Sequence, residues 1–262
     1  MINNFLKNWL SLEIISKITN SFLSEGLDIR FVGGCVRDSL LNIESLDFDL
    51  CVNCSPYLIE EILLKNKLLF NNKWKKYGSI NILDENLFIQ ITSLREDYNH
   101  SGRKADVRFT TNFKKDACRR DFSFNAIYLT PNGEISDFFE GIKDIKENKV
   151  RFIGDAQQRI EEDYLRIVRY YRFLAMFKTP NIIFEYHDII LQNLKKLSLN
   201  VSNDKILIEL DKMAKNPYSI NSFMDINNSL KKNVLIEYLI QIWTQQNFVR
   251  GLDKIKLQLN NF

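Results

Sequence analysis

A glycine turn between two apolar segments restricts most strongly how this chain can fold. The run LDIRFV predicts a short buried strand that ends at Gly33 and Gly34, and a helix is expected to start within residues 36–41. The run DFDLCV, which begins at Asp47, predicts a second strand. Asp47 and Asp49 are two positions apart, so a strand places both carboxylates on one face.

Two carboxylates on one face repel each other unless a cation lies between them. Few oxygen ligands from the protein, with phosphate oxygens completing the shell, are typical of a magnesium site. Glycines such as Gly33 and Gly34 let backbone amides approach a phosphate chain closely. A simple turn and a solvated strand edge are the alternative interpretations. The combination of the glycine pair and the aspartate pair within one short segment indicates the handling of a nucleoside triphosphate.

Length and composition limit the class of protein without selecting a function. A chain of 262 residues allows one large domain or two small ones, and its hydrophobic share of 45% is typical of a globular protein. The net charge of +3 does not by itself indicate a nucleic-acid partner. Basic residues do cluster, at Lys73-Lys75-Lys76, Lys114-Lys115-Arg119-Arg120 and Arg166-Arg169-Arg172. A solvated helix face explains such clusters most simply, but the third repeats every three residues along one face.

The cysteines and the N-terminus favour a reducing compartment. Cys51 and Cys54 form a single C-V-N-C spacing without a second pair or a histidine cluster, so reduced thiols are expected. The first residues are amphipathic and carry charge, unlike a signal peptide. No apolar run approaches the roughly 18 residues that cross a bilayer. We therefore expect no membrane association and a cytoplasmic location.

The order of the expected elements predicts an α+β head followed by helices. Apolar spacing predicts one helix over residues 4–24, strands between 68 and 94, and a hairpin around Asn132-Gly133. The polar segment 95–105 reads as a mobile loop. Past Gly141 helical periodicity dominates, which places the seam near residues 141–153.

Two further motifs carry candidate chemistry. In RRDFSFNA, Arg119 and Arg120 point about 100° apart on a helix, and Asn125 suits a ribose hydroxyl because it both donates and accepts. A solvated helix end before a core strand is the alternative. In EEDYLRIVRYYRF, Asp163 and Arg166 are expected on one helix face, either as a salt bridge or as a template for the edge of a base.

These motifs together resemble a known family. GGCVRDSLL with DFD, RRDFSFNA, DFFEG and EDYLRIVRYYRF are similar to motifs A to D of class II tRNA nucleotidyltransferases. These are the CCA-adding enzymes, which are grouped with bacterial poly(A) polymerases. The resemblance covers roughly residues 28–178, in the family's order and approximate spacing.

The resemblance implies a division of the chain into three parts. Residues 1–140 would form a nucleotidyltransferase head with a small mixed or antiparallel sheet and helices. Residues 141–214 would form a helical neck that holds the nucleotide template, and residues 215–262 a reduced helical body that contacts tRNA. Because phosphate contacts dominate nucleic-acid affinity, a reduced body predicts weaker and more salt-sensitive tRNA binding.

The resemblance also implies roles for individual residues. Asp47 and Asp49 would be the catalytic ligands of Mg²⁺, and Arg95 and Arg103 would belong to a flexible loop that helps the switch from CTP to ATP. Together with the arguments above, the expected nucleotide contacts are Gly33, Gly34, Arg37, Arg120, Asn125, Asp163, Arg166, Arg169 and Arg172. Asp38 is expected to orient Arg37 or to cap its helix.

Several positions depart from the family pattern. Ser123 replaces the usual Thr and keeps the hydroxyl, and Gln90 stands where many members carry Glu. The fifth motif should show Glu-Arg on a neck helix, and Asp204-Lys205 occupies the nearest position. His187-Asp188 resembles a phosphohydrolase motif, but the chain has only two histidines, so His187 is expected to be an ordinary helix residue.

The expected reaction is the template-independent addition of C, C and A to tRNA 3′ ends from CTP and ATP, with release of pyrophosphate. An A-adding enzyme or a poly(A) polymerase is the nearest alternative, because both share the template motif. A non-catalytic tRNA-binding remnant is a more distant one. The sequence leaves the oligomeric state and any protein partner open.

Overall fold

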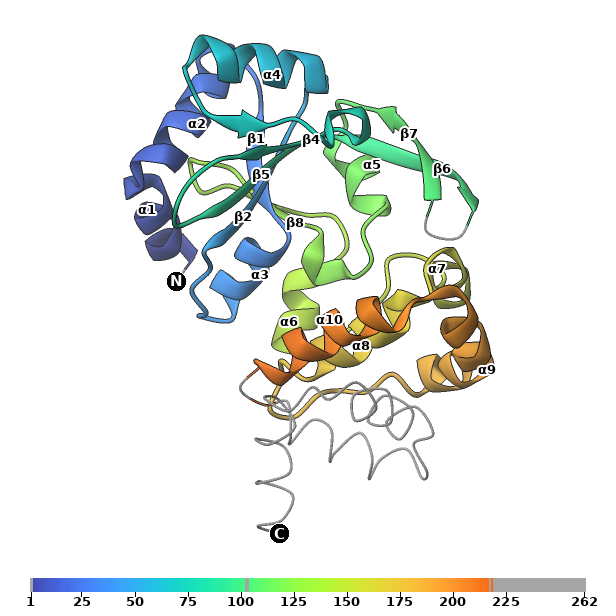
Figure 1. Ribbon diagram of the computed structural model, residues 1–262. Helices are drawn as coiled ribbons and strands as arrows, with labels where there is room; N and C mark the ends of the chain where they lie inside the picture. Colours follow the sequence, from blue (N-terminus) through green and yellow to red (C-terminus); the bar gives the residue numbers. More distant parts are fainter. Residues whose placement is uncertain (1, 102–103, 217, 219–262) are drawn as a thin grey trace. The chain divides into compact units, whose positions relative to one another are not determined.

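A computed structural model describes residues 2–101, 104–216 and 218, and it divides into two compact units. The first unit is Met1–Ile145 and the second is Lys146–Phe262. Figure 1 shows a sheet with helices in the first unit and helices in the described part of the second. The predicted α+β class, with a mixed-sheet head followed by helices, is confirmed.

A seven-stranded sheet of order β3-β4-β5-β2-β1-β8-β9 forms the centre of the first unit. Strand β2 runs parallel to β5, and the other neighbours are antiparallel. The strands are β1 (Ile29–Val32), β2 (Asp47–Val52), β3 (Phe70–Asn71), β4 (Ser79–Ile82), β5 (Phe88–Ser93), β8 (Ile127–Leu129) and β9 (Ile135–Asp137). Its helices and 3-10 turns are α1 (Ile2–Ser11), α2 (Glu13–Leu23), α3 (Gly34–Leu40), α4 (Pro56–Lys65), η1 (Lys75–Tyr77), α5 (Phe113–Cys118), η2 (Ser123–Asn125) and α6 (Gly141–Lys146).

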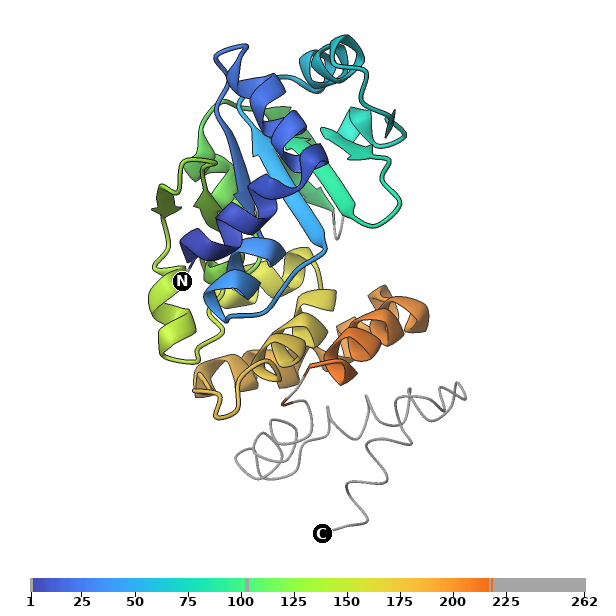
Figure 2. The same ribbon diagram turned by 90° about the vertical axis from the view of Figure 1, so that its left-hand side faces the viewer.

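One face of the sheet is covered by the N-terminal helices. Figure 2 shows α1 and α2 lying across this face. Trp9 of α1 packs against Phe31 and Phe48, with ring centroids 5.1 and 5.5 Å away, and all three side chains are buried. Because side chains alternate along a strand, burying Phe48 under α1 turns Asp47 and Asp49 toward the opposite face.

The N-terminal segment forms two helices where the apolar spacing predicted one. Leu12 has an extended backbone with ψ 118° and begins a new helix at Glu13. The buried residues Trp9 and Ile15 are six positions apart, about 240° around a continuous helix. A break between them allows both side chains to enter the core, which a single helix would not.

The segment expected as a mobile loop is a paired hairpin. Strands β6 (Arg95–Ser101) and β7 (Lys104–Phe109) form a two-stranded antiparallel sheet, so the loop prediction is wrong for these residues. Their polar composition hid the strands, because strand preference reflects packing against neighbours. The guanidinium of Arg108 lies 5.2 Å from the ring of Tyr98 and supplies such a contact. Arg103 lies outside the described residues.

Two local predictions about turns and caps are confirmed. Ser55 caps α4 by accepting a hydrogen bond from the Leu58 amide at 3.3 Å, and Pro56 occupies the first helical position. Strands β8 and β9 form the expected hairpin, in which Gly133 has φ +93°. Positive φ at this point suits the glycine that the sequence placed there.

The described part of the second unit is built from helices. They are α7 (Ala156–Glu162), α8 (Leu165–Leu174), α9 (Phe184–Asn200) and α10 (Asn203–Ala214). The rings of Phe152, Tyr170 and Tyr186 pack within 6.0 Å of one another in its core. His187 lies on α9 as expected.

No helix in the described ranges is long and apolar enough to cross a membrane. The expected functional boundaries at 140 and 214 stay predictions, and the expected body at 215–262 lies almost wholly outside the described residues.

Trp9→Ala tests whether the contact between α1 and the sheet stabilises the first unit. We expect a loss of about 3–5 kcal/mol in the free energy of unfolding, because the substitution removes a 4% exposed ring from a packed core. Urea denaturation followed by circular dichroism measures the loss. Trp74→Ala is the matched control, because Trp74 is 48% exposed and its loss should change stability by no more than about 0.5 kcal/mol. Equal losses in the two variants would contradict the packing argument.

Candidate functional site

The glycine turn lies directly against the second aspartate. Gly33 has φ +77°, and a Cβ atom there would be 3.3 Å from Asp49 Oδ2 and 3.6 Å from Arg120 Nη1. The positive φ therefore favours glycine, and a Cβ atom would also press on the Asp49 carboxylate. The structure thus brings together Gly33 and Asp49 of the first motif and Arg120 of the second.

Asp47 and Asp49 share one face of β2 and differ in their surroundings. Asp47 is exposed and Asp49 is half-buried. Burial raises the pKa of Asp49, the positive charge of Arg120 opposes that rise, and the negative charge of Asp47 adds to it. The carboxylate pair therefore carries an electrostatic cost that a bound cation would remove.

Arg37 is held in place by contacts on both sides of its guanidinium. Its Nε donates to Asp38 Oδ1 at 2.9 Å, which confirms that Asp38 orients it. Its Nη1 donates to Asn125 Oδ1 at 2.7 Å, and Asn125 Nδ2 donates to Asp121 Oδ1 at 3.0 Å. Arg37 also lies near Gly34, where a Cβ atom would be 3.8 Å from Nη2. The first and second motifs thus meet at Arg37.

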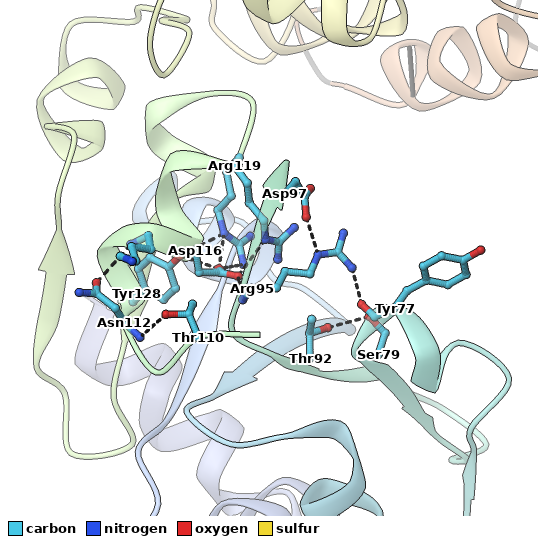
Figure 3. A network of polar contacts seen from close by, with 12 residues as sticks. Tyr77, Ser79, Thr92, Arg95, Asp97, Thr110, Asn112, Asp116, Arg119 and Tyr128 are labelled. Carbon is cyan, nitrogen blue, oxygen red and sulfur yellow. Dashed lines mark hydrogen bonds and ion pairs between the residues drawn. The ribbon is translucent and has the colours of Figure 1, made fainter. Parts of the chain in front are cut away.

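Asp116 is a buried carboxylate that sequence reasoning missed. Figure 3 shows it at the centre of a polar network. Its oxygens accept hydrogen bonds from Arg119 Nε at 2.9 Å, Arg120 Nη2 at 3.2 Å and Tyr128 Oη at 2.8 Å. The Arg95 amide, at the start of the β6–β7 hairpin, donates to the same carboxylate at 3.1 Å. A lone Asp within KKDACRR looks like an ordinary surface acid, so only the fold identifies it.

Burial raises the pKa of Asp116, but the charges of Arg119 and Arg120 and the Tyr128 hydroxyl outweigh this and lower it to about 2. The side chain therefore stays ionised at neutral pH. It holds both arginines in place through ion pairs. Arg95 is placed by the same network, since its Nη1 also donates to the Tyr77 carbonyl at 2.5 Å.

An open pocket of about 590 Å³ lies beside the two aspartates. Besides Asp47 and Asp49, its lining comes from residues 81–90 of β4, β5 and the turn between them. Gln90 pairs with Asp49 in the β2–β5 register, and its Nε2 donates to Asn81 Oδ1 at 2.9 Å. The residue that stands in place of the family's Glu thus makes a neutral hydrogen bond at the pocket wall.

Two carboxylates and an open pocket fit a metal ion that takes its remaining ligands from phosphate and water. Among the described residues there is no group of three or more His, Cys, Asp or Glu side chains that could enclose a metal. The described residues therefore do not form a closed structural metal site.

The expected placement of Asp163 and Arg166 on one helix is wrong. Helix α7 ends at Glu162 and α8 begins at Leu165, with an extended backbone at Asp163, φ −151° and ψ 102°. The Asp163 carboxylate accepts a hydrogen bond from the Leu165 amide at 3.1 Å. Asp side chains compete for backbone amides in this way, which favours a helix boundary over a helix interior.

Arg166 is held by a residue that sequence reasoning did not select. Its Nη1 donates to Glu162 Oε2 at 2.8 Å and to the Arg159 carbonyl at 2.6 Å. The same Glu162 oxygen accepts from Arg159 Nη1 at 2.6 Å. Glu162 therefore fixes two arginines at the junction of α7 and α8.

A third buried acid, Glu209 of α10, was also missed. It lies 3.7 Å from Arg169 Nη1 and 3.0 Å from Arg172 Nε, and its side chain is only 6% exposed. Asp204-Lys205, which occupies the expected fifth motif, lies one turn earlier on the same helix. The available signal was an acid among the apolar residues of ILIEL, which predict a buried helix face. Because acids are rarely buried without a partner, such a position indicates a paired basic residue.

The fold and the first unit's site together define a nucleotidyltransferase-type head, with paired carboxylates, a glycine turn and converging arginines. Comparison with known proteins agrees. Residues 29–151 match the family described as Poly A polymerase head domain. CCA tRNA nucleotidyltransferase 1, mitochondrial, of Homo sapiens is 37% identical over 204 residues, which cover 77% of this chain and 47% of the relative. The CCA-adding enzyme of Leuconostoc citreum is 32% identical over 201 residues, covering 76% and 48%.

Solved structures give the same result. The crystal structure of the Bacillus stearothermophilus CCA-adding enzyme in complex with CTP is similar with a TM-score of 0.68 and 26% identity, covering 80% of this chain and 50% of that one. The chain spans about half the length of the curated relatives it matches. The resemblance predicted from the motifs is confirmed: residues 29–151 carry a head domain of the poly(A) polymerase family, and the chain is similar to CCA-adding enzymes over most of its length.

Asp116→Asn tests the central carboxylate of the network. We expect a loss of about 3–5 kcal/mol in the free energy of unfolding at pH 7, because two guanidiniums lose their shared counter-charge. The pKa of Asp116 is about 2 when folded, below its ordinary 3.8, so its ionised form stabilises the fold fully above about pH 4. About 2 kcal/mol of that stabilisation should disappear as pH falls toward 2. Urea denaturation across pH 2–7 measures it, and a gap between wild type and variant that does not narrow in acid would contradict the assignment.

Glu209→Gln tests the buried acid of the second unit. We expect a loss of about 3 kcal/mol, since Arg169 and Arg172 would face an uncharged partner inside the protein. Asp211→Asn is the matched control on the same helix. Its pair with Lys215 is largely exposed, with side-chain exposures of 42% and 73%, and should contribute no more than about 1 kcal/mol. Thermal unfolding measures the loss of stability in both variants. Equal losses in the two variants would contradict the role of Glu209 as a buried partner of the arginines.

Proposed function

We propose that this protein is a template-independent tRNA nucleotidyltransferase that adds C, C and A to tRNA 3′ ends from CTP and ATP and releases pyrophosphate. The observation that carries the proposal is the placement of Asp49 beside Gly33 and Arg120, with Asp47 two positions away on the same strand. The names of the similar proteins, which are CCA-adding enzymes, support the choice of reaction.

In this proposal Asp47 and Asp49 hold divalent metal, taken as Mg²⁺. The metal would lower the pKa of the attacking 3′-hydroxyl and neutralise charge on the leaving pyrophosphate. The amides around Gly33 and Gly34 face the phosphate chain. Arg37 pairs with it through a guanidinium that Asp38 and Asn125 already orient.

Nucleotide choice is assigned to the second unit. Asp163 and Arg166 present an acceptor and donors that match the edge of cytosine or adenine. Their position at a helix boundary does not remove this role, because Glu162 holds Arg166 and the Leu165 amide holds Asp163. Arg169 and Arg172 are proposed to contact the nucleotide from the next turns of α8. Arg95 and Arg103 remain the proposed residues of the specificity switch.

The proposed partners are tRNA, through its acceptor stem and 3′ end, and the two nucleotides. The cytoplasmic location expected from the sequence stays a prediction, and the matched relatives of Homo sapiens, Mus musculus and Danio rerio are named as mitochondrial.

An A-adding enzyme or a poly(A) polymerase is the second candidate, because the matching head domain is described by the name of the poly(A) polymerase. The decisive experiment offers three substrates, tRNA without CCA, tRNA ending in C and tRNA ending in CC, with CTP or ATP singly. Addition of C to the first two and of A only to the third supports CCA addition. Addition of A alone to every substrate supports the second candidate.

Asp49→Asn tests the carboxylate pair. We expect the rate of nucleotide addition to fall by roughly 10²- to 10³-fold or more, because metal binding contributes several kcal/mol to transition-state stabilisation. Asp84→Asn is the matched control, since Asp84 lines the same pocket from the turn before β5. Single-turnover addition of C at saturating Mg²⁺ is the measurement. Near-normal turnover of Asp49→Asn would remove the proposed mechanism.

Asp163→Ala tests the proposed template. We expect the variant to accept wrong nucleotides while it keeps much of its overall rate, because the lost contact selects the base and not the reacting atoms. The ratio of kcat/KM for CTP over UTP measures this. A uniform loss of activity with an unchanged ratio would assign Asp163 a structural role at the α7–α8 junction.

A further inference from the structure

An exposed cluster of lysines and aromatic rings lies apart from the residues assigned to catalysis. It is formed by the η1 segment and by the start of α4, and we call it the lysine–aromatic surface. Its members are Tyr57, Lys73, Trp74, Lys75, Lys76 and Tyr77. Tyr57, Trp74 and Tyr77 are 69%, 48% and 42% exposed, although large rings are usually buried more deeply.

The lysines are interleaved with the rings. Lys73 Nζ lies 5.7 Å from the ring of Trp74, Lys75 Nζ 4.8 Å from the ring of Tyr57, and Lys76 Nζ 4.8 Å from the ring of Tyr77. The rings of Trp74 and Tyr77 lie 6.0 Å apart. Cations near aromatic faces on an open surface combine phosphate attraction with stacking.

The surface is held in one conformation by its own backbone. The Tyr77 amide donates to the Trp74 carbonyl at 2.9 Å, and the Gly78 amide donates to the Lys75 carbonyl at 2.8 Å. Gly78 has φ +90° and packs so closely that a Cβ atom would be 2.8 Å from Phe109. A preformed arrangement loses little conformational entropy when a ligand binds.

This surface is linked by direct contacts to the proposed catalytic site of the same unit. The Tyr77 carbonyl accepts from Arg95, whose amide donates to Asp116, and Asp116 binds Arg120 beside Gly33. Figure 3 shows the Tyr77 ring extending away from these contacts. The carbonyl of Tyr77 thus belongs to the Asp116 network, while its ring belongs to the lysine–aromatic surface.

We propose that the lysine–aromatic surface is a second RNA-binding site, at which phosphates pair with Lys73 and Lys76 and unpaired bases stack on Trp74 and Tyr77. The proposal rests on the proposed function, which brings RNA to this unit. Aromatic rings between the lysines favour RNA over an acidic peptide, because every base offers a face for stacking. The partner is the tRNA substrate, held at a point other than its reacting 3′ end.

The first test is the affinity of the full-length protein for tRNA lacking CCA, measured by fluorescence anisotropy at several salt concentrations. Trp74→Ala should bind about 5-fold or more weakly, as expected for the loss of one stacked base. The pair Lys73→Gln and Lys76→Gln should lower the slope of log Kd against log salt by about 1.4, which corresponds to two phosphate contacts.

Matched variants separate this effect from net charge and from folding. The pair Lys7→Gln and Lys17→Gln removes the same charge from exposed positions of α1 and α2, and it should leave the slope unchanged. Trp74→Phe keeps a ring and should recover most of the affinity. The value of kcat at saturating tRNA should be unchanged in the Trp74 variants, since the substitution alters binding and not the reacting groups.

Failure of this proposal and failure of the proposed function give different results. Suppose that wild type adds nucleotides, while Trp74→Ala and the double variant Lys73→Gln, Lys76→Gln bind tRNA as tightly as wild type. The proposed RNA-binding surface is then contradicted, and the proposed reaction is supported. Suppose instead that wild type adds no nucleotide, but a short oligouridine quenches Trp74 fluorescence in wild type and not in the Lys73→Gln, Lys76→Gln variant. The proposed RNA-binding surface is then supported, and the proposed reaction is contradicted. Quenching by phosphatidylglycerol vesicles but not by oligouridine would overturn the surface in favour of a lipid partner.

Discussion

The contact on which the head's proposed site depends is the pairing of one buried carboxylate with two guanidiniums. Asp116 binds Arg119 and Arg120, and it also receives the Tyr128 hydroxyl from β8 and the Arg95 amide from β6. A charge buried without partners would be too costly to keep, so these partners must all be present together. The sheet, the hairpin and α5 are therefore fixed to one another at the point where Arg120 reaches Gly33 and Asp49.

Packing on the other side of the sheet completes this arrangement. Trp9 covers Phe31 and Phe48, and alternation along β2 then directs Asp47 and Asp49 away from that core. Strand β2 is thus both a core element and the carrier of the candidate metal ligands. Burial raises the pKa of Asp49, and the positive charge of Arg120 on the same face opposes that rise.

Sequence reasoning predicted what depends on local pattern. The glycine turn, the Asp47 and Asp49 pair, the Ser55 cap and the hairpin at Gly133 all depend on the spacing of a few neighbouring residues. It failed where composition hides an element or where a side chain interrupts one. The mostly polar segment β6 is a strand through its pairing with β7, and Asp163 leaves the helix because its carboxylate binds a backbone amide two residues further on. Asp116 and Glu162 were missed although each has arginines three and four positions away, because the sequence does not show that these acids are largely buried. The arginines of Glu209 lie on another helix, so only the fold pairs them with it.

Those three acids share one design across the two units. Each binds two arginines: Asp116 holds Arg119 and Arg120, Glu162 holds Arg159 and Arg166, and Glu209 holds Arg169 and Arg172. One acid between two guanidiniums fixes the positions of both. Without the acid, the two arginines would repel each other. Guanidiniums fixed in this way still attract a polyphosphate, and they lose little side-chain entropy when it binds. In the first unit one such acid holds Arg120, and in the second unit two such acids hold Arg166, Arg169 and Arg172, which are among the arginines proposed to contact the nucleotide.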